Sequence, residues 1–285
     1  MRAEQVTAVE AEHGEGPVWW PSWGLRYVDM LAGDVLTVGD DGSVSRTHVG
    51  MVAAALRPRV GGGAVIALER CFAFAARDDL SDVTAFDEVW SDPAVRFNDG
   101  GCDPDGRFYC GSMAYDATPG AATLYRVTPG AEHAPEAVFD RVTVSNGLGF
   151  SPDGGRAYYN DTATGRTDVF DYDSVRGLHT RRPFVTYDDG AGLPDGLCVD
   201  SEGGVWVALW GGSAVRRYAP DGALDLIVEV GASQVSACTF GGPDLDTLYI
   251  TTSRTGLDEG AEPAAGAVFA VRPGVTGLPT LPYAG

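Results

Sequence analysis

A short turn followed by a strand-like run of aromatic and β-branched residues recurs along this chain. The turns are rich in Gly, Pro and Asp, and the runs that follow have the composition of buried β-strands. Successive copies lie 39, 43, 49, 49 and 42 residues apart. The six copies are anchored at Gly24, Gly63, Gly106, Gly155, Gly204 and Asp246.

A strand-rich repeat of this length predicts the fold. The blades of a β-propeller have four strands and recur at about 40–50 residues. One blade cannot bury both of its faces, so neighbouring blades stack around a central axis. The six anchors therefore predict an all-β, six-bladed β-propeller. We expect residues 1–285 to form a single domain, because no Pro/Ser-rich linker divides the chain.

The two ends of the chain are expected to meet in one blade. A strand near residues 5–10 has the pattern needed to complete a sheet begun by strands at 247–252 and 267–271. Such pairing would close the ring.

The charge of the chain excludes several partners. Acidic residues outnumber basic ones 40 to 20, the net charge is −20, and all of the basic residues are Arg. DNA and anionic membranes would be repelled, so we expect neither as a partner. The N-terminus lacks the apolar run of a signal peptide. We therefore expect a cytoplasmic protein, as a monomer or a weak homo-oligomer.

Four polar side chains stand at the predicted entrances of innermost strands, which line the channel of a propeller. They are Glu15, Asn98, Asn146 and Asp195. Together they offer two carboxylates and two amide oxygens, hard donors that suit Ca²⁺, Mg²⁺ or Mn²⁺. Their net charge of −2 matches a divalent cation, which would offset the cost of burying the carboxylates.

Each of these residues also has a simpler interpretation. Asn146-Gly147 and Asp195-Gly196 are common turn dipeptides, and Asn98-Asp99-Gly100 is a turn signal as well. Glu15 could be a solvated loop acid. Their joint occurrence at blade-periodic offsets favours a shared site.

Other catalytic templates are absent from the sequence. Without a G-x-S-x-G elbow, a Walker loop or a G-x-G-x-x-G motif, neither an α/β-hydrolase nor a nucleotide cofactor is supported. The histidines form no metal-binding pair, and we expect them on the surface or in loops: His13, His48, His133 and His179.

Several short motifs occur in a characteristic order from about residue 12 to the C-terminus, and in this combination the chain resembles the SMP-30/gluconolactonase/regucalcin family. The motifs are Glu15-Gly-Pro-Val-Trp, Arg96-x-Asn98-Asp99-Gly, Gly111-Ser-Met113, Ser145-Asn146-Gly147-Leu148, Pro194-Asp195-Gly196, Cys238-x-Phe-Gly-Gly and Thr251-Thr-Ser-Arg-Thr-Gly-Leu.

This resemblance implies a divalent-metal lactonase that opens sugar lactones, such as glucono- or xylonolactone, to aldonic acids. Glu15, Asn146 and Asp195 match the family's metal ligands, and Asp195 also matches its general base. Arg96 and Asn98 match residues that bind the sugar-like substrate. Asp116 stands where regucalcin-like members have a substrate-contacting Glu. We expect one divalent cation, Ca²⁺ first, with Zn²⁺, Mn²⁺, Mg²⁺ or Fe²⁺ as alternatives.

Two other functions stay open. The same ligands could serve a calcium-binding regulatory protein of the regucalcin type, without turnover. A propeller hydrolase acting on other esters or organophosphates is the third possibility.

Overall fold

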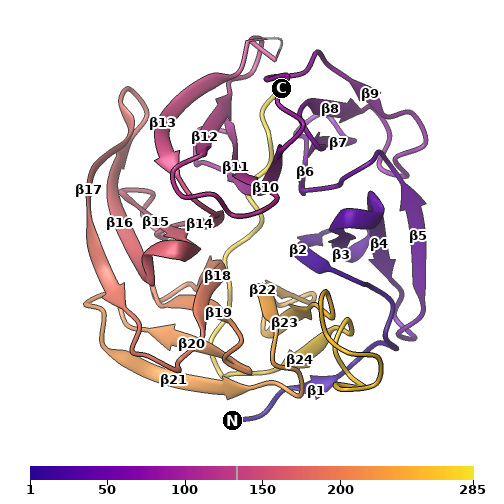
Figure 1. The fold of residues 1–285 in the computed structure, drawn as a ribbon, viewed down its shortest axis with the longest axis vertical. Helices are drawn as coiled ribbons and strands as arrows, with labels where there is room; N and C mark the ends of the chain where they lie inside the picture. The colour runs from indigo at the N-terminus through magenta and orange to yellow at the C-terminus, as the bar shows by residue number, and fades with distance from the viewer. Residues whose placement is uncertain (133) are drawn as a thin grey trace.

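Six antiparallel sheets of four strands each form a ring in the computed structural model, which describes residues 1–132 and 134–285 (Figure 1). The prediction of an all-β, six-bladed propeller is confirmed. Of the four histidines considered above, His133 lies outside the described residues.

The blades follow one another along the chain. Blade 1 has β2 (Gly14–Trp20), β3 (Gly24–Asp29), β4 (Asp34–Val38) and β5 (Val44–His48); blade 2 has β6 (Ala55–Pro58), β7 (Ala64–Ala67), β8 (Phe72–Ala75) and β9 (Thr84–Ala85); blade 3 has β10 (Val95–Cys102), β11 (Phe108–Ala114), β12 (Ala122–Val127) and β13 (Glu136–Val142). Blade 4 has β14 (Ser145–Phe150), β15 (Arg156–Asp161), β16 (Arg166–Asp173) and β17 (Gly177–Thr186); blade 5 has β18 (Leu193–Val199), β19 (Val205–Trp210), β20 (Ala214–Tyr218) and β21 (Leu224–Glu229); blade 6 has β22 (Val235–Gly241), β23 (Thr247–Thr252), β24 (Phe269–Val271) and β1 (Glu4–Gln5).

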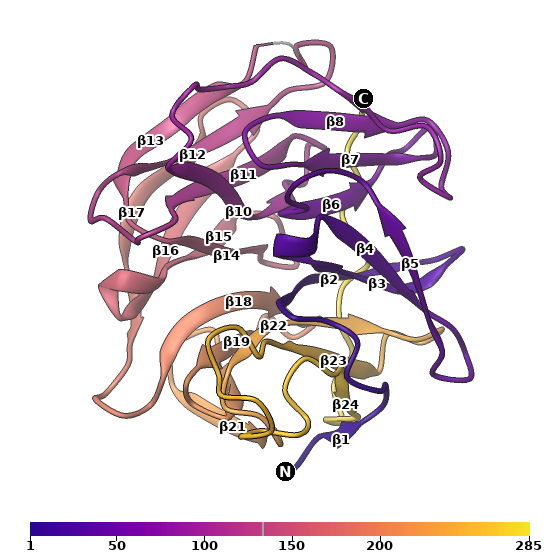
Figure 2. The same ribbon diagram turned by 45° about the vertical axis from the view of Figure 1, so that its right-hand side comes forward.

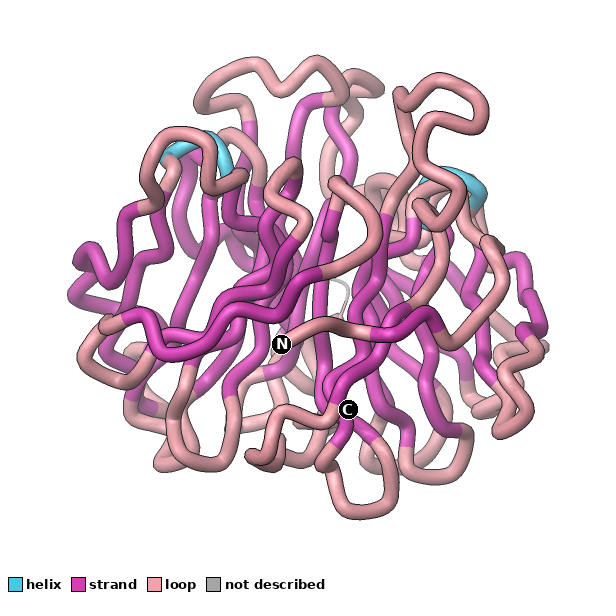
Figure 3. Tube along the Cα trace, turned by 90° about the horizontal axis from the view of Figure 1, so that it is seen from below, coloured by secondary structure: helices cyan, strands magenta, loops and turns pink. Residues whose placement is uncertain are grey.

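The first strand of each blade lies nearest the central axis, as Figure 1 shows. Each of the six anchors found in the sequence lies at, or one or two residues before, the start of the second strand of its blade. The repeat therefore reflects the turn that leads from the inner strand to its neighbour. Two single-turn 3-10 helices, Met30–Ala32 and Thr162–Thr164, lie on the same face of the ring (Figure 3). No helix in the described residues is long and apolar enough to cross a lipid bilayer.

The N-terminal segment closes the ring by pairing with two blades. The amide of Ala3 donates to the carbonyl of Glu229 in β21 at 2.9 Å. In the next two residues, Glu4 pairs with Ala270 and Gln5 with Phe269 in β24. The expectation that the two ends share a blade is confirmed, with the strand at Glu4–Gln5 instead of near residues 5–10.

The core fills the spaces between neighbouring blades. One cluster joins Tyr158 and Val169 of blade 4 to Leu197 and Val207 of blade 5. The apolar side chains on facing sheets are almost fully buried, which is the main favourable contribution to folding. Burial on both faces explains why second strands such as Ala64–Ala67 and Val205–Trp210 read as nearly continuous apolar runs.

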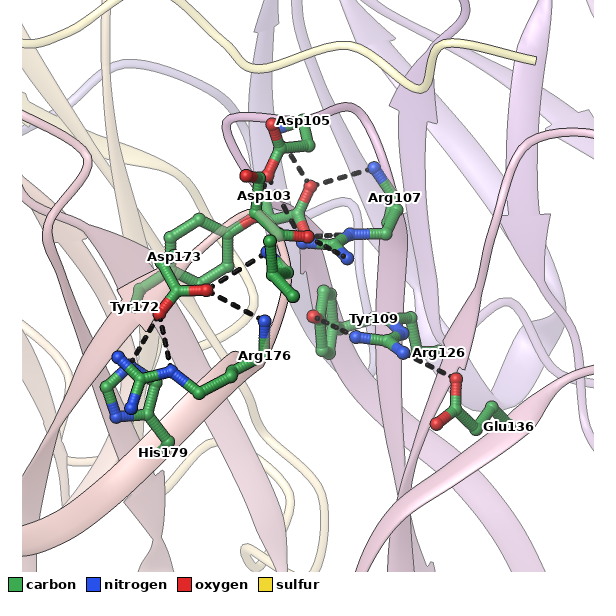
Figure 4. Close-up of polar contacts among 12 residues, drawn as sticks. Asp103, Asp105, Arg107, Tyr109, Arg126, Glu136, Tyr172, Asp173, Arg176 and His179 are labelled. Atoms are coloured by element: carbon green, nitrogen blue, oxygen red, sulfur yellow. Dashed lines mark hydrogen bonds and ion pairs between the residues drawn. The ribbon is translucent and has the colours of Figure 1, made fainter.

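Polar contacts add a second connection between blades 3 and 4 (Figure 4). Arg107 donates to Asp103 at 2.6 Å and to the hydroxyl of Tyr172 on β16 at 2.6 Å. That hydroxyl in turn donates to Asp105 at 2.6 Å. Because each buried polar group has a partner, the network costs little and fixes the two blades relative to each other.

The C-terminal segment 277–285 crosses the face of the ring where the inner strands end, and its path is visible in yellow in Figures 1 and 2. Gly277 bridges to Asp200 in blade 5, and the amide of Ala284 donates to the carbonyl of Gly106 in blade 3 at 2.9 Å. Beneath the segment lies a cavity of about 550 Å³, lined among others by Val18, Leu148 and Val199. This cavity lies at the opposite end of the inner strands from the predicted site.

Tyr283 anchors the C-terminal segment, since its ring is fully buried and its hydroxyl donates to Glu132 at 3.0 Å. We expect Tyr283→Ala to lower the free energy of unfolding by about 3 kcal/mol, through lost burial and the cavity left behind. Urea unfolding would measure the change. Tyr283→Phe is the matched control, which should cost only about 1 kcal/mol because it removes the hydrogen bond alone. Equal losses in both variants would contradict this assignment.

Candidate active site

Five of the six inner strands in the described part of the chain carry a β-bulge. In β10, Phe97 pairs with Ser112 and Gly100 with Cys110, so that one extra residue is inserted opposite β11. Equivalent shifts occur in β2 after Glu15, in β14 after Ser145, in β18 after Pro194 and in β22 after Val235. Bulges re-aim side chains and are common next to active sites.

The predicted polar residues lie at or beside these bulges, inside strands. Asn98, Asn146 and Asp195 each follow directly after the last regularly paired residue, and Glu15 is that residue in β2. All four side chains are at most 4 % exposed. The alternative interpretations as plain turns or a solvated loop acid are therefore wrong for these residues.

A chain of hydrogen bonds connects blades 3 and 4 at the site. Arg96 donates to the Oδ1 of Asn98 at 2.7 Å. Asn98 donates through Nδ2 to the Oδ1 of Asn146 at 3.2 Å and to the carbonyl of Ser145 at 2.8 Å. Three of the predicted residues are thus in direct contact, from Arg96 to Asn146.

A second set of contacts holds Asn146 and Asp195 across blades 4 and 5. Asn146 donates through Nδ2 to the hydroxyl of Thr162 at 2.8 Å, and this hydroxyl donates to the carbonyl of Pro194 at 2.8 Å. Asn160 donates to the carbonyl of Asp195 at 2.6 Å. These bonds therefore hold the side chain of Asn146 and the backbone at Asp195.

The site concentrates negative charge in a buried place. Burial raises the pKa of Glu15 to about 8, and the nearby charge of Asp99 adds to the effect. Burial also raises the pKa of Asp195 well above its usual range, helped by the charges of Glu15 and Asp99. A backbone hydrogen bond opposes each shift in pKa, from Gly16 for Glu15 and from Gly196 for Asp195, and the positive charge of Arg96 opposes both. Glu15 and Asp195 therefore share one electrostatic environment.

This environment fits a divalent cation. The Oδ1 of Asp195 is buried and has no hydrogen-bond partner among the described residues. An unpaired buried carboxylate oxygen is costly unless a cation or donor reaches it. The donor set of two carboxylates and an amide oxygen from Asn146 belongs to the class that hard cations prefer.

Arg96 is buried beside the cluster, and its guanidinium also donates to the Sδ of Met30 at 2.9 Å. The ring of Tyr115 lies 5.6 Å from its Cζ atom. The Nε of Arg96 is buried without a partner among the described residues, which leaves one directed donor at the site.

Asp116 lies apart from this cluster, exposed on the loop that follows β11. Its carboxylate accepts hydrogen bonds from the amide and the hydroxyl of Thr118, at 3.0 and 2.7 Å. These bonds hold its pKa below the usual range. Its predicted contact with substrate stays a prediction.

Two residues near the site were missed by the sequence analysis. Asp99 is a third buried carboxylate, and the only signal for it was its place in the Asn98-Asp99-Gly100 string. His13, expected on the surface or in a loop, is buried; its Nδ1 lies 2.8 Å from the hydroxyl of Ser253, and burial lowers its pKa to about 4.

The geometry defines a propeller whose inner strands bring buried carboxylates, amides and one arginine to a single end of the channel. Comparison with known proteins assigns it further. The model of the SMP-30/Gluconolactonase/LRE-like region matches residues 13–254. The chain is 38 % identical to regucalcin from Danio rerio over 299 residues, covering 100 % of this chain and 99 % of that protein. The chain therefore belongs to the SMP-30/gluconolactonase/LRE-like family.

Solved structures share the fold closely. The structure of a calcium-binding protein, regucalcin, from Agrobacterium tumefaciens superposes with a TM-score of 0.90 at 27 % identity, covering 99 % of this chain and 97 % of that one. A luciferin-regenerating enzyme gives a TM-score of 0.88 at 29 % identity, covering 96 % of each chain.

The raised pKa of Glu15 predicts how pH affects the metal-free protein. The folded state holds this proton more tightly than the unfolded state, whose pKa is near 4.5, so folding stability should fall as pH rises from about 5 to about 8. In Glu15→Gln this part of the fall should disappear. Thermal unfolding in a chelator at several pH values measures both slopes.

The control for this experiment is Glu259→Gln, which changes an exposed loop acid and should keep the wild-type slope. An unchanged slope in Glu15→Gln would show that the buried acid does not control the pH dependence.

Proposed function

We propose that this protein is a divalent-cation-dependent hydrolase that opens sugar lactones, such as glucono- or xylonolactone, to aldonic acids. The observation that carries the proposal is the pair of buried carboxylates, Glu15 and Asp195, next to Asn146 and the Arg96–Asn98 hydrogen bond. Membership of a family named for gluconolactonase supports the reaction class.

Glu15, Asn146 and Asp195 would hold the cation, with Ca²⁺ as the first expectation and Zn²⁺, Mn²⁺, Mg²⁺ or Fe²⁺ as alternatives. When bound, a divalent cation supplies Lewis-acid polarisation of an ester carbonyl and lowers the pKa of water. Its charge would also lower the pKa values of Glu15 and Asp195, which keeps both carboxylates ionised at neutral pH.

Asp195 would act as the general base. Its Oδ1 has no protein partner among the described residues, so it is available to accept a proton from water. Asn160 holds the backbone of Asp195 through its carbonyl, which limits the freedom of the side chain. A base held in one position gains rate because no further ordering is needed during the reaction.

Arg96 and Asn98 would orient the lactone. The unpaired Nε of Arg96 can donate to a substrate oxygen, while Asn98 is held between Arg96 and Ser145. Asp116 would add a contact from the exposed loop after β11, once its carboxylate turns from Thr118.

In the reaction the oxygen of water forms a bond to the acyl carbon, and the bond from that carbon to the ring oxygen breaks. Asp195 accepts a proton of the attacking water and returns it to the ring oxygen, which leaves as a hydroxyl. The product is an open hydroxy acid, which ionises in solution.

A second candidate function is calcium binding without turnover. Relatives at 32–38 % identity carry the name regucalcin, and the Agrobacterium structure is described as a calcium-binding protein. The same carboxylates and amides would serve either role, but a binding protein has no need of Arg96 beside them.

Asp195→Asn tests the catalytic assignment. We expect a folded protein whose kcat for gluconolactone falls about 10²–10⁴-fold, because the amide cannot accept the proton. A pH-drop assay gives the rate, and metal analysis shows whether the cation is retained. Asp221→Asn, on an exposed turn, is the matched control and should keep full activity. A near-wild-type rate in Asp195→Asn with metal bound would exclude Asp195 as the base.

Arg96→Ala distinguishes the two candidate functions. For a lactonase, kcat/KM should fall at least about 10-fold while the affinity for Ca²⁺ is not weakened, since Arg96 orients substrate, is not a ligand and carries a positive charge. Calorimetric titration with Ca²⁺ measures the affinity. Tight Ca²⁺ binding by a wild-type protein that hydrolyses none of a panel of sugar lactones would favour the binding role.

A further inference from the structure

Several large apolar side chains lie on elements next to the candidate site, on the face where the inner strands begin. Leu31, Tyr115 and Leu193 are 41 %, 47 % and 47 % exposed, and Trp210 is half-buried. We call Leu31, Tyr115, Leu193 and Trp210 the apolar rim. Isolated exposed side chains of this kind are ordinary, but a group of them around one site indicates a binding surface.

One contact and several short distances along the chain connect the rim to the site residues. Tyr115 places its ring 5.6 Å from the Cζ of Arg96, and Leu31 follows Met30, whose sulfur accepts a hydrogen bond from Arg96. Leu193 is two residues before Asp195 and pairs with Trp210 across β18 and β19. Tyr115 of blade 3 therefore contacts a site residue, while Leu31 of blade 1 and the Leu193–Trp210 pair of blade 5 lie within a few residues of one along the chain.

The ring of Trp210 continues this surface toward blade 1. It meets the ring of His13 edge-on, with ring centroids 5.8 Å apart, and His13 is two residues before Glu15. Aromatic rings at such a mouth offer flat apolar area to a ligand.

Several polar groups around the rim are already paired within the protein. The hydroxyl of Tyr115 donates to Glu69 at 2.7 Å, and the carboxylate of Asp116 is bonded to Thr118. The hydroxyl of Thr162 bonds both Asn146 and Pro194. The outer hydroxyl groups of a sugar lactone would have to displace such bonds, as at Asp116, whereas an apolar substituent needs no hydrogen-bond partner.

We propose that the site also takes lactones that bear an alkyl or aryl substituent on the ring carbon next to the ring oxygen. This inference rests on the proposed function, since the bond broken is the same acyl–oxygen bond and water is the only co-reactant. The lactone group would lie at Asp195 and Arg96, and the substituent would lie on the apolar rim. Burial of its methylene groups against Leu193, Tyr115 and Trp210 would supply binding that a hydroxylated ring lacks.

The experiment compares kcat/KM for δ-decalactone, which carries a five-carbon chain, with kcat/KM for δ-gluconolactone, using the metal-loaded full-length protein and a pH-drop assay. We expect the alkyl lactone to be hydrolysed at least as efficiently as the sugar lactone. In Leu193→Ser the ratio of the two values should fall about 10-fold, the scale set by losing apolar contact in a pocket. The control Val175→Ser alters an exposed apolar residue on the turn between β16 and β17 and should leave the ratio unchanged.

The outcomes separate the two proposals. Hydrolysis of gluconolactone alone, or a ratio that Leu193→Ser leaves unchanged, would overturn the inference and leave the proposed function standing. Failure to hydrolyse either lactone with any of the candidate metals would overturn both. A thermal melt of Leu193→Ser verifies that the variant is folded, as expected for a half-exposed side chain.

Discussion

The pairing of the first residues with blades 5 and 6 is the interaction on which the rest of the molecule depends. A ring of blades is stable only when the last blade packs against the first, and here a two-residue strand and its flanking amides hold that junction. Two contacts across the same junction support one side of the site: Ser236 of blade 6 donates to the carbonyl of Gly14 at 2.6 Å, and Ser253 contacts His13. Both contacts fix the start of β2, and therefore Glu15. The contacts that close the ring therefore also position Glu15 in the site.

Within the closed ring, β-bulges give the inner strands their chemistry. A regular inner strand would alternate its side chains between the two neighbouring blades, and a polar residue there would enter an apolar core. The inserted residue breaks this alternation at Asn98, Asn146 and Asp195 and directs polar atoms to the channel end while the rest of the strand stays paired. The glycines that follow allow neighbouring strands to approach closely: a Cβ on Gly196 would lie 2.4 Å from that of Ala237. The energetic cost is the burial of three carboxylates, which explains the raised pKa values of Glu15, Asp99 and Asp195.

The sequence predicted the blade number because the turn before the second strand is the most regular part of each repeat, from Gly24 to Asp246. It located Glu15, Asn98, Asn146 and Asp195 because polar residues stand out ahead of apolar strands. It could not distinguish a bulge from a turn, since both use Asn, Asp and Gly. For the same reason Asp99 was passed over, although the bulge buries it together with Asn98. His13 was missed because its burial depends on Ser253 and Trp210, which are distant in the sequence. The position of Asp116 depends on loop geometry, which local patterns do not encode.

The sixth inner strand, β6, keeps regular pairing from Ala55 to Pro58. Ala53 and Ala54 lead into it and Ala55 is its first residue, and all three are fully buried. The carbonyl of Ala54 would lie 3.6 Å from a Cβ placed on Gly16, next to Glu15. The channel wall beside Glu15 is therefore made of methyl groups and backbone on this one side. Substitutions at these alanines would change the volume available near the cation ligands without adding or removing a charge. In blade 2, the space beside the cation ligands can therefore be varied by substitution while the charged residues of the other blades stay unchanged.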